Sequence, residues 1–171
     1  MKLRAQQLAG AFLALLTRTE QAIAVAALFV TAAALLADIF AREVLFSSLF
    51  GSLRVAVYGM AFAALFGFCV CVAANAHIRV TIFDGITPAA WRPLVCRFAD
   101  LLSFAICAAF GWFAAHYVWQ TYMVAETDVA LGIVVWPFQL ALVWAFISGG
   151  LRYGLFFVFP ALRPQEQEIV Q

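Results

Sequence analysis

The chain has 171 residues, of which 67% are hydrophobic and only 11% are charged, and its mean hydropathy is +1.01. Soluble domains are about 25% charged, so the composition excludes an ordinary water-soluble domain. The net charge is only +1, and the basic residues do not cluster as they do in proteins that bind nucleic acids. We therefore predict an integral membrane protein with no nucleic-acid partner.

The first predicted element is an amphipathic helix over residues 1–18 that lies flat on the membrane surface. Leu8, Phe12, Leu15 and Leu16 recur at i, i+4, i+7 and i+8 and so form one apolar face. Basic residues flank this face, as in helices that bind the membrane interface. We prefer this interpretation to a cleaved signal peptide, because charged residues follow the apolar run without a small-residue cleavage site.

Four transmembrane helices follow in the chain. A helix that crosses a bilayer needs about 17–25 apolar residues, and the charge-free intervals are long enough for four of them. The predicted spans are 20–41, 55–77, 99–124 and 129–152, and residues 153–171 form an interfacial extension and a tail. The predicted fold class is therefore an all-α membrane protein with a single membrane domain, 1–171.

The lysine and arginine residues gather on one side of this arrangement. They precede the first span, connect the second span to the third and follow the fourth, whereas the opposite side has only Arg42 and Arg54. Positively charged segments stay in the cytoplasm, so we predict that both termini are cytoplasmic.

Charged side chains deep in a membrane mark transport pathways, because they are costly to bury. Only His116 lies clearly inside a predicted span. The other ionisable side chains lie in loops, tails or interfaces, as Glu20 and Arg152 do, or near helix ends: Asp38, Arg42, Arg54, His77, Asp100 and Glu126. The sequence also has no nucleotide-binding, nucleophile or zinc-protease motif. We therefore expect neither an enzyme nor a self-sufficient transporter, and no metal ion or other cofactor.

One face of the third span is both polar and aromatic. It contains Trp112, His116, Trp119, Gln120 and Met123, spaced i, i+4, i+7, i+8 and i+11. Two interpretations are equally compatible with this spacing: contact with another membrane subunit, or packing among the four helices of this chain.

A haem-bearing electron-transfer subunit is a further class to consider, because four-helix anchors can hold haem between histidines on facing helices. The two histidines are His77, at the predicted inner end of the second span, and His116, roughly 22 Å deeper at 1.5 Å per residue. One haem cannot bridge that difference in depth. A haem-free anchor of a respiratory complex stays open as an alternative.

Two motifs indicate a family. Leu65-Phe66-Gly67 is followed ten residues after the glycine by His77-Ile78-Arg79-Val80, and Arg42-Glu43-Val44-Leu45-Phe46 closes the first span. They resemble the Phe-Leu-Gly, His-Ile-Arg-Val and Arg-Tyr-Val-Phe motifs of the small membrane subunit, the DctQ-like or Q-type small permease, of tripartite ATP-independent periplasmic (TRAP) transporters. Glu43 departs from the tyrosine of that pattern.

The resemblance implies a small scaffold subunit in the bacterial inner membrane that serves organic-acid uptake. Such a subunit pairs with a large membrane subunit that carries the substrate and coupling-ion sites, and a periplasmic substrate-binding protein delivers the substrate. The small subunit of tripartite tricarboxylate transporters is an alternative of similar size. Six residues are the expected contacts with a partner or with membrane lipids: Arg42, His77, Arg79, Trp112, His116 and Gln120.

Overall fold

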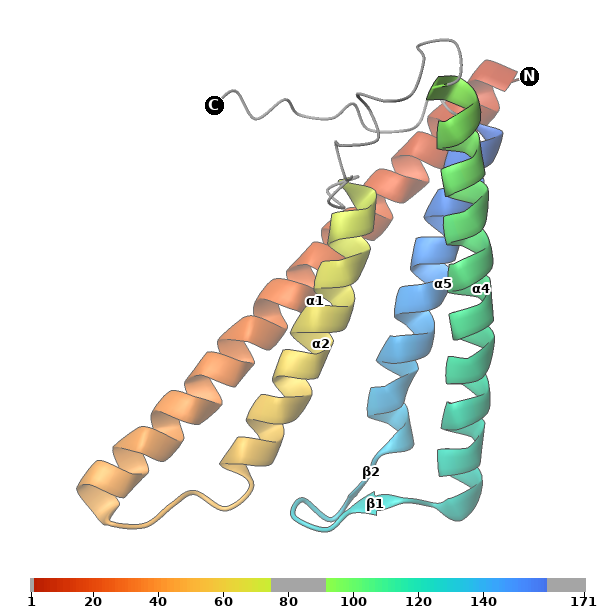
Figure 1. Cartoon of the computed structure of the whole chain (residues 1–171). Coiled ribbons are helices and arrows are strands. Elements are labelled where there is room, and N and C mark those ends of the chain that lie inside the picture. The colour runs from red at the N-terminus through yellow and green to blue at the C-terminus, as the bar shows by residue number, and fades with distance from the viewer. Residues whose placement is uncertain (1, 75–91, 160–171) are drawn as a thin grey trace.

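The computed structural model describes residues 2–74 and 92–159 and is almost entirely helical within them. Each of its four helices is long and apolar enough to cross a membrane, which confirms the predicted all-α fold with four such helices. The elements are α1 (Lys2–Leu45), α2 (Ser52–Ala73), α4 (Arg92–Val124), β1 (Thr127–Asp128), β2 (Ile133–Val134) and α5 (Trp136–Val158) (Figure 1).

Successive helices run in opposite directions (Figure 1). The α1–α2 loop and the β1–β2 hairpin lie at one end of the molecule, which we call the hairpin end. The start of α1, the start of α4 and the finish of α5 lie at the other, which we call the N-terminal end. The chain therefore runs between the two ends of the molecule four times, once in each helix.

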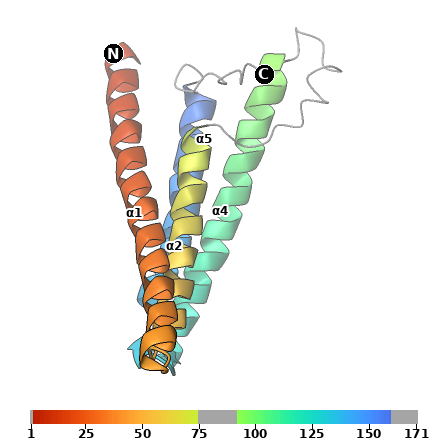
Figure 2. The same cartoon turned by 90° about the vertical axis from the view of Figure 1, so that its left-hand side faces the viewer.

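The helices pack as two pairs, α1 with α2 and α4 with α5, and α2 joins the pairs by packing on α5. Helix α1 slants across the molecule, from α2 at the hairpin end toward α5 at the N-terminal end (Figure 1). Seen from the side, α1 and α4 spread apart toward the N-terminal end with α5 between them (Figure 2). Helix α5 is accordingly the most buried of the four, and α1 is the least buried.

The close approach of α1 and α2 depends on Gly59. A Cβ atom added there would collide with the Thr31 hydroxyl and would lie 3.2 Å from the carbonyl oxygen of Ala27. Small residues allow membrane helices to pack closely. Because Gly59 has no side chain, α1 and α2 can approach each other at this point more closely than any larger residue would allow.

The first predicted boundary differs from the structure. The sequence favoured a surface helix over 1–18 and a separate span over 20–41, whereas α1 is one continuous helix over both segments. Residues 11–50 contain no glycine or proline and are rich in alanine and leucine, which favour an uninterrupted helix. The placement of residues 1–18 on the membrane surface stays a prediction.

The predicted start of the fourth span at residue 129 is wrong. Residues 127–134 form an antiparallel hairpin, in which Thr127 pairs with Val134, and α5 begins at Trp136. Gly132 turns the chain with a φ of +65°, and Pro137 lies in the first turn of α5, where its missing N–H costs no helical hydrogen bond. Helix α5 then continues to Val158, past the predicted finish at residue 152.

The other boundaries shift less. Helix α2 covers Ser52–Ala73, where 55–77 was predicted, and α4 begins at Arg92 instead of residue 99. The predicted contact residues His77 and Arg79, and most of the tail 153–171, lie outside the described residues.

Candidate functional site

A buried ion pair joins α1 to α5. Arg152 Nη2 lies 2.6 Å from Glu20 Oε2, and each side chain is only 1% exposed. No sign of this pairing is visible in the sequence, because the predicted boundaries put Glu20 at the interface of the first span and Arg152 at the end of the fourth. Glu20 lies within α1, and Arg152 lies within α5, six residues before it ends.

Three further polar side chains complete this site. Glu20 Oε1 accepts hydrogen bonds from Ser148 Oγ (2.6 Å) and from Trp144 Nε1 (3.2 Å). Arg152 donates from Nη2 to Thr17 Oγ1 (3.1 Å) and from Nη1 to Ser148 Oγ. We call these five residues the Glu20–Arg152 cluster. Glu20, Ser148 and Arg152 are buried, Thr17 is partly buried and Trp144 is exposed. The cluster's two opposite charges cancel, and the bonds satisfy most of its polar atoms, which makes burial in a low-dielectric environment tolerable.

The helical repeat explains how the cluster assembles. Trp144, Ser148 and Arg152 follow one another at intervals of four and so lie on one face of α5. Thr17 and Glu20 are three residues apart and share a face of α1. The spacing on α5 is visible in the sequence, but only the crossing of α1 over α5 shows that the two faces meet.

A second polar site lies at the hairpin end, around Asp128. Its Oδ2 accepts a hydrogen bond from the Tyr58 hydroxyl (3.0 Å), and its Oδ1 accepts bonds from the backbone N–H groups of Ala130 (2.9 Å) and Leu131 (3.1 Å). Arg54 Nη1 lies 3.9 Å from Oδ2. Burial alone would raise the pKa of Asp128, but the hydrogen bonds and Arg54 together hold that pKa below its usual value of 3.8. The carboxylate therefore ties the hairpin to α2.

The predicted contact residue Arg42 lies at the same end, beside the α1–α2 loop. Its Nη2 is 2.8 Å from Asp38 Oδ2, and its side chain is 61% exposed. The other oxygen of Asp38 accepts a hydrogen bond from the backbone N–H of Leu49 (3.0 Å). Arg42 thus supports the residue that holds the loop and still presents much of its guanidinium outward.

The polar and aromatic face of α4 is exposed. Trp112 is 73% exposed, and His116, Trp119, Gln120 and Met123 are exposed as well. We call these five residues the outer face of α4. Trp112 and Trp119 also line clefts between α4 and α5. The exposure of the face favours contact with another membrane subunit over packing among the helices of this chain, and that contact stays a prediction.

In the two ranges that the structure describes, no three histidine, cysteine, aspartate or glutamate side chains are grouped closely enough to hold a metal ion.

Comparison with protein families matches residues 31–158 to the family described as "Tripartite ATP-independent periplasmic transporters, DctQ component". The match covers about three quarters of the chain and begins within α1 and ends with α5, so that all four helices contribute to it. A search of curated proteins finds no match. The family is one of transporter components and not of enzymes, which favours the TRAP interpretation over a respiratory anchor or a tricarboxylate transporter subunit. The chain therefore belongs to the DctQ family, the small membrane component of TRAP transporters.

Proposed function

We propose that this chain is the scaffold subunit of a TRAP-type secondary transporter that takes up an organic acid. It pairs with the large membrane subunit, which carries the substrate and coupling-ion sites, while a periplasmic binding protein delivers the substrate. Membership of the DctQ family supports a role in a TRAP transporter, and the exposed outer face of α4 is the observation that supports pairing with the large subunit.

The outer face of α4 is a costly surface to leave in lipid. His116 and Gln120 carry hydrogen-bonding groups, and such groups need partners in a hydrocarbon environment. Trp112 and Trp119 on the same face supply large amphipathic surfaces, which are frequent at protein interfaces. A helix of the large subunit can offer a hydrogen-bond acceptor to His116 or Gln120 and can also cover the surface of the two tryptophans.

The proposed orientation places the N-terminal end in the cytoplasm and the hairpin end in the periplasm, with the chain in the bacterial inner membrane. The distribution of lysine and arginine supports it. The length of α1 supports the interfacial role of its first part: 44 residues extend roughly 66 Å at 1.5 Å per residue, about twice the 30 Å of a hydrocarbon core. Residues 1–18 then lie in or beyond the cytoplasmic interface.

The remaining predicted contacts, Arg42, His77 and Arg79, belong to this proposal as sites for a partner carboxylate or a lipid headgroup. Arginine suits either role, since its planar guanidinium can form two parallel hydrogen bonds to a carboxylate or a phosphate. Arg79→Lys is therefore expected to weaken a specific contact although the charge is retained.

Co-purification with the large subunit tests the proposal. A tag on this chain should recover the large subunit from membranes, and the double variant H116L/Q120L should recover severalfold less of it. The matched control is Gln21→Leu, which replaces an exposed glutamine on α1 and leaves the outer face of α4 intact. Equal recovery of the large subunit by the unaltered chain, the double variant and the control contradicts pairing through α4. Failure of the unaltered chain to recover any large subunit contradicts the proposed function itself.

A further inference from the structure

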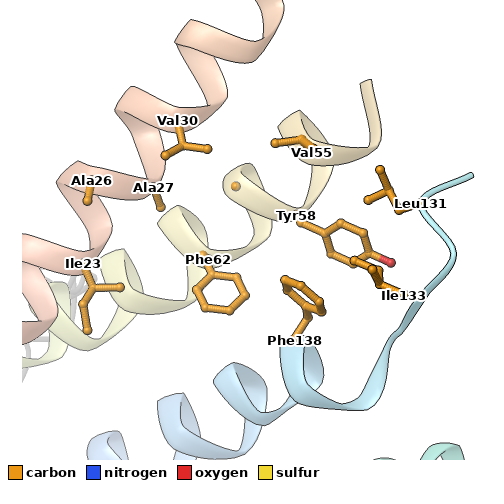
Figure 3. A pocket seen from close by; sticks show the side chains of 11 residues that line it. Ile23, Ala26, Ala27, Val30, Val55, Tyr58, Phe62, Leu131, Ile133 and Phe138 are labelled. Carbon is orange, nitrogen blue, oxygen red and sulfur yellow. The ribbon is translucent and has the colours of Figure 1, made fainter. Parts of the chain in front are cut away.

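A groove of about 400 Å³ opens between α1, α2 and the hairpin (Figure 3). Ala26 and Val30 line it from α1, Val55 and Phe62 from α2, Ile133 from the hairpin and Phe138 from α5. Its lining is almost wholly apolar, and its one hydroxyl, that of Tyr58, already donates a hydrogen bond to Asp128. A charged or strongly polar ligand therefore finds no partner inside the groove.

The groove lies along parts of α1 and α2 that are apolar enough to cross a membrane. Along α1 it extends from Ile23 to Val30, and along α2 from Val55 to Phe62. Either stretch is roughly 10 Å long at 1.5 Å per residue, which is most of the roughly 15 Å that one leaflet contributes to a 30 Å core. On α2 the groove begins three residues after the first residue of the helix, Ser52, so it starts near the hairpin end and is long enough to run through most of one leaflet. Apolar cavities do not retain water, so the occupant is apolar.

The volume of the groove decides between its two possible apolar occupants, a helix of a partner protein and an acyl chain of a lipid. One turn of a helix about 10 Å wide and 5.4 Å high has a volume of roughly 400 Å³, so a partner helix can insert only a few side chains. An acyl chain is thinner and can lie along the whole groove, between the α1 wall and the α2 wall.

A positively charged side chain, that of Arg54, lies at the hairpin end of the groove. Arg54 precedes Val55 of the lining, its Nη1 is 3.9 Å from the same Asp128 oxygen that Tyr58 contacts, and its side chain is 59% exposed. An ion pair of that length leaves most of the guanidinium donors available to another acceptor. Arg42, the other arginine at this end, is held more closely, at 2.8 Å from Asp38.

We propose that this groove binds one phospholipid of the leaflet at the hairpin end, with an acyl chain between α1 and α2 and the headgroup phosphate on Arg54. The apolar lining selects the chain, and the exposed guanidinium selects the phosphate. The site is separate from the outer face of α4, because the groove is lined from α1, α2, the hairpin and α5 and by no residue of α4.

The test is native mass spectrometry of the full chain after reconstitution in vesicles of phosphatidylethanolamine and phosphatidylglycerol and extraction into mild detergent. The unaltered chain should retain one phospholipid. Ala26→Phe fills the groove and should abolish retention, whereas Leu28→Phe, on an exposed part of α1 outside the lining, should not. Retention by A26F equal to that of the unaltered chain overturns the proposal.

The headgroup contact has its own control. Arg54→Gln should weaken retention roughly tenfold, the effect of losing one charge-assisted hydrogen bond. The matched control Arg97→Gln, at an exposed arginine of α4 at the N-terminal end, should leave retention unchanged. A photoreactive residue placed at Val30 of the chain in the assembled transporter then identifies the occupant in the membrane. A phospholipid adduct supports the proposal, and an adduct with a peptide of the large subunit overturns it in favour of a protein interface.

Discussion

The carboxylate of Glu20 and the guanidinium of Arg152, 132 residues apart in the chain, meet at 2.6 Å with each side chain 1% exposed. Because α1 otherwise packs on α2, this pair fastens the N-terminal part of α1 to the C-terminal part of α5. Asp128 and Tyr58 make a corresponding connection at the hairpin end. The two helix pairs are thus tied to each other at two places along their length.

Breaking the ion pair should destabilise the protein strongly. Glu20→Gln leaves Arg152 buried without a counter-charge, and removal of one partner of a buried pair costs about 3–5 kcal/mol. The free energy of unfolding in mixed detergent micelles measures this loss. Ser148→Ala is the milder comparison, because it removes hydrogen bonds of the cluster and leaves both charges in place.

Removing both charges should cost far less than removing one. In the double variant E20M/R152M no buried charge is left unpaired, and replacement of a whole buried pair by apolar residues is often neutral or stabilising. The double variant should therefore unfold closer to the unaltered chain than either single variant does. A double variant less stable than both single variants would contradict the role assigned to the pair.

Two glycines of α2 should respond in opposite ways to substitution by alanine. At Gly59 the new methyl group collides with the Thr31 side chain, and overpacking of this kind costs about 1–3 kcal/mol. At Gly67 no atom lies within 4 Å of the place that the new methyl group would occupy, and alanine favours helix by up to about 1 kcal/mol. Thermal unfolding of G59A and G67A in detergent compares the two directly, and equal destabilisation would exclude close α1–α2 packing at Gly59 as the cause.

Acid should loosen the hairpin. The folded-state pKa of Asp128 is below its usual value of 3.8, so the ionised carboxylate stabilises the fold above that value, and the stabilisation is lost as the pH falls through the folded-state pKa. The midpoint of thermal unfolding of Asp128→Asn should be lower than that of the unaltered chain at pH 7. The difference should shrink below pH 3.8. Tyr58→Phe removes one of the bonds that lower the pKa, and should move this loss to higher pH. A difference that does not change with pH contradicts the assignment.

The sequence was sufficient for the number of helices, because long charge-free apolar stretches have few other uses. It was insufficient for the start of α5, because Val129, Ile133 and Val134 are as apolar in a hairpin as in a span, and hydropathy does not separate the two. Gly132 and Pro137 were the local signals of a turn followed by a helix.

The site was predictable in part. The helical repeat showed that His116 and Gln120 share a face of α4, and the buried small residues opposite them, Cys107, Ala114 and Val118, show which side packs inward. The partnership of Glu20 with Arg152 was out of reach, because it depends on the angle at which α1 crosses α5. Glu20 also precedes the segment that matches the family, 31–158, whereas Arg152 lies within it.

The central claim is that this chain supports a transporter without itself moving the substrate. Its most direct test is sodium-driven uptake of an organic acid into proteoliposomes that contain this chain alone, the large subunit with the binding protein, or all three. We predict uptake with all three components, none with this chain alone, and severely reduced uptake when this chain is omitted. Uptake by this chain alone, or full uptake in its absence, would contradict the claim.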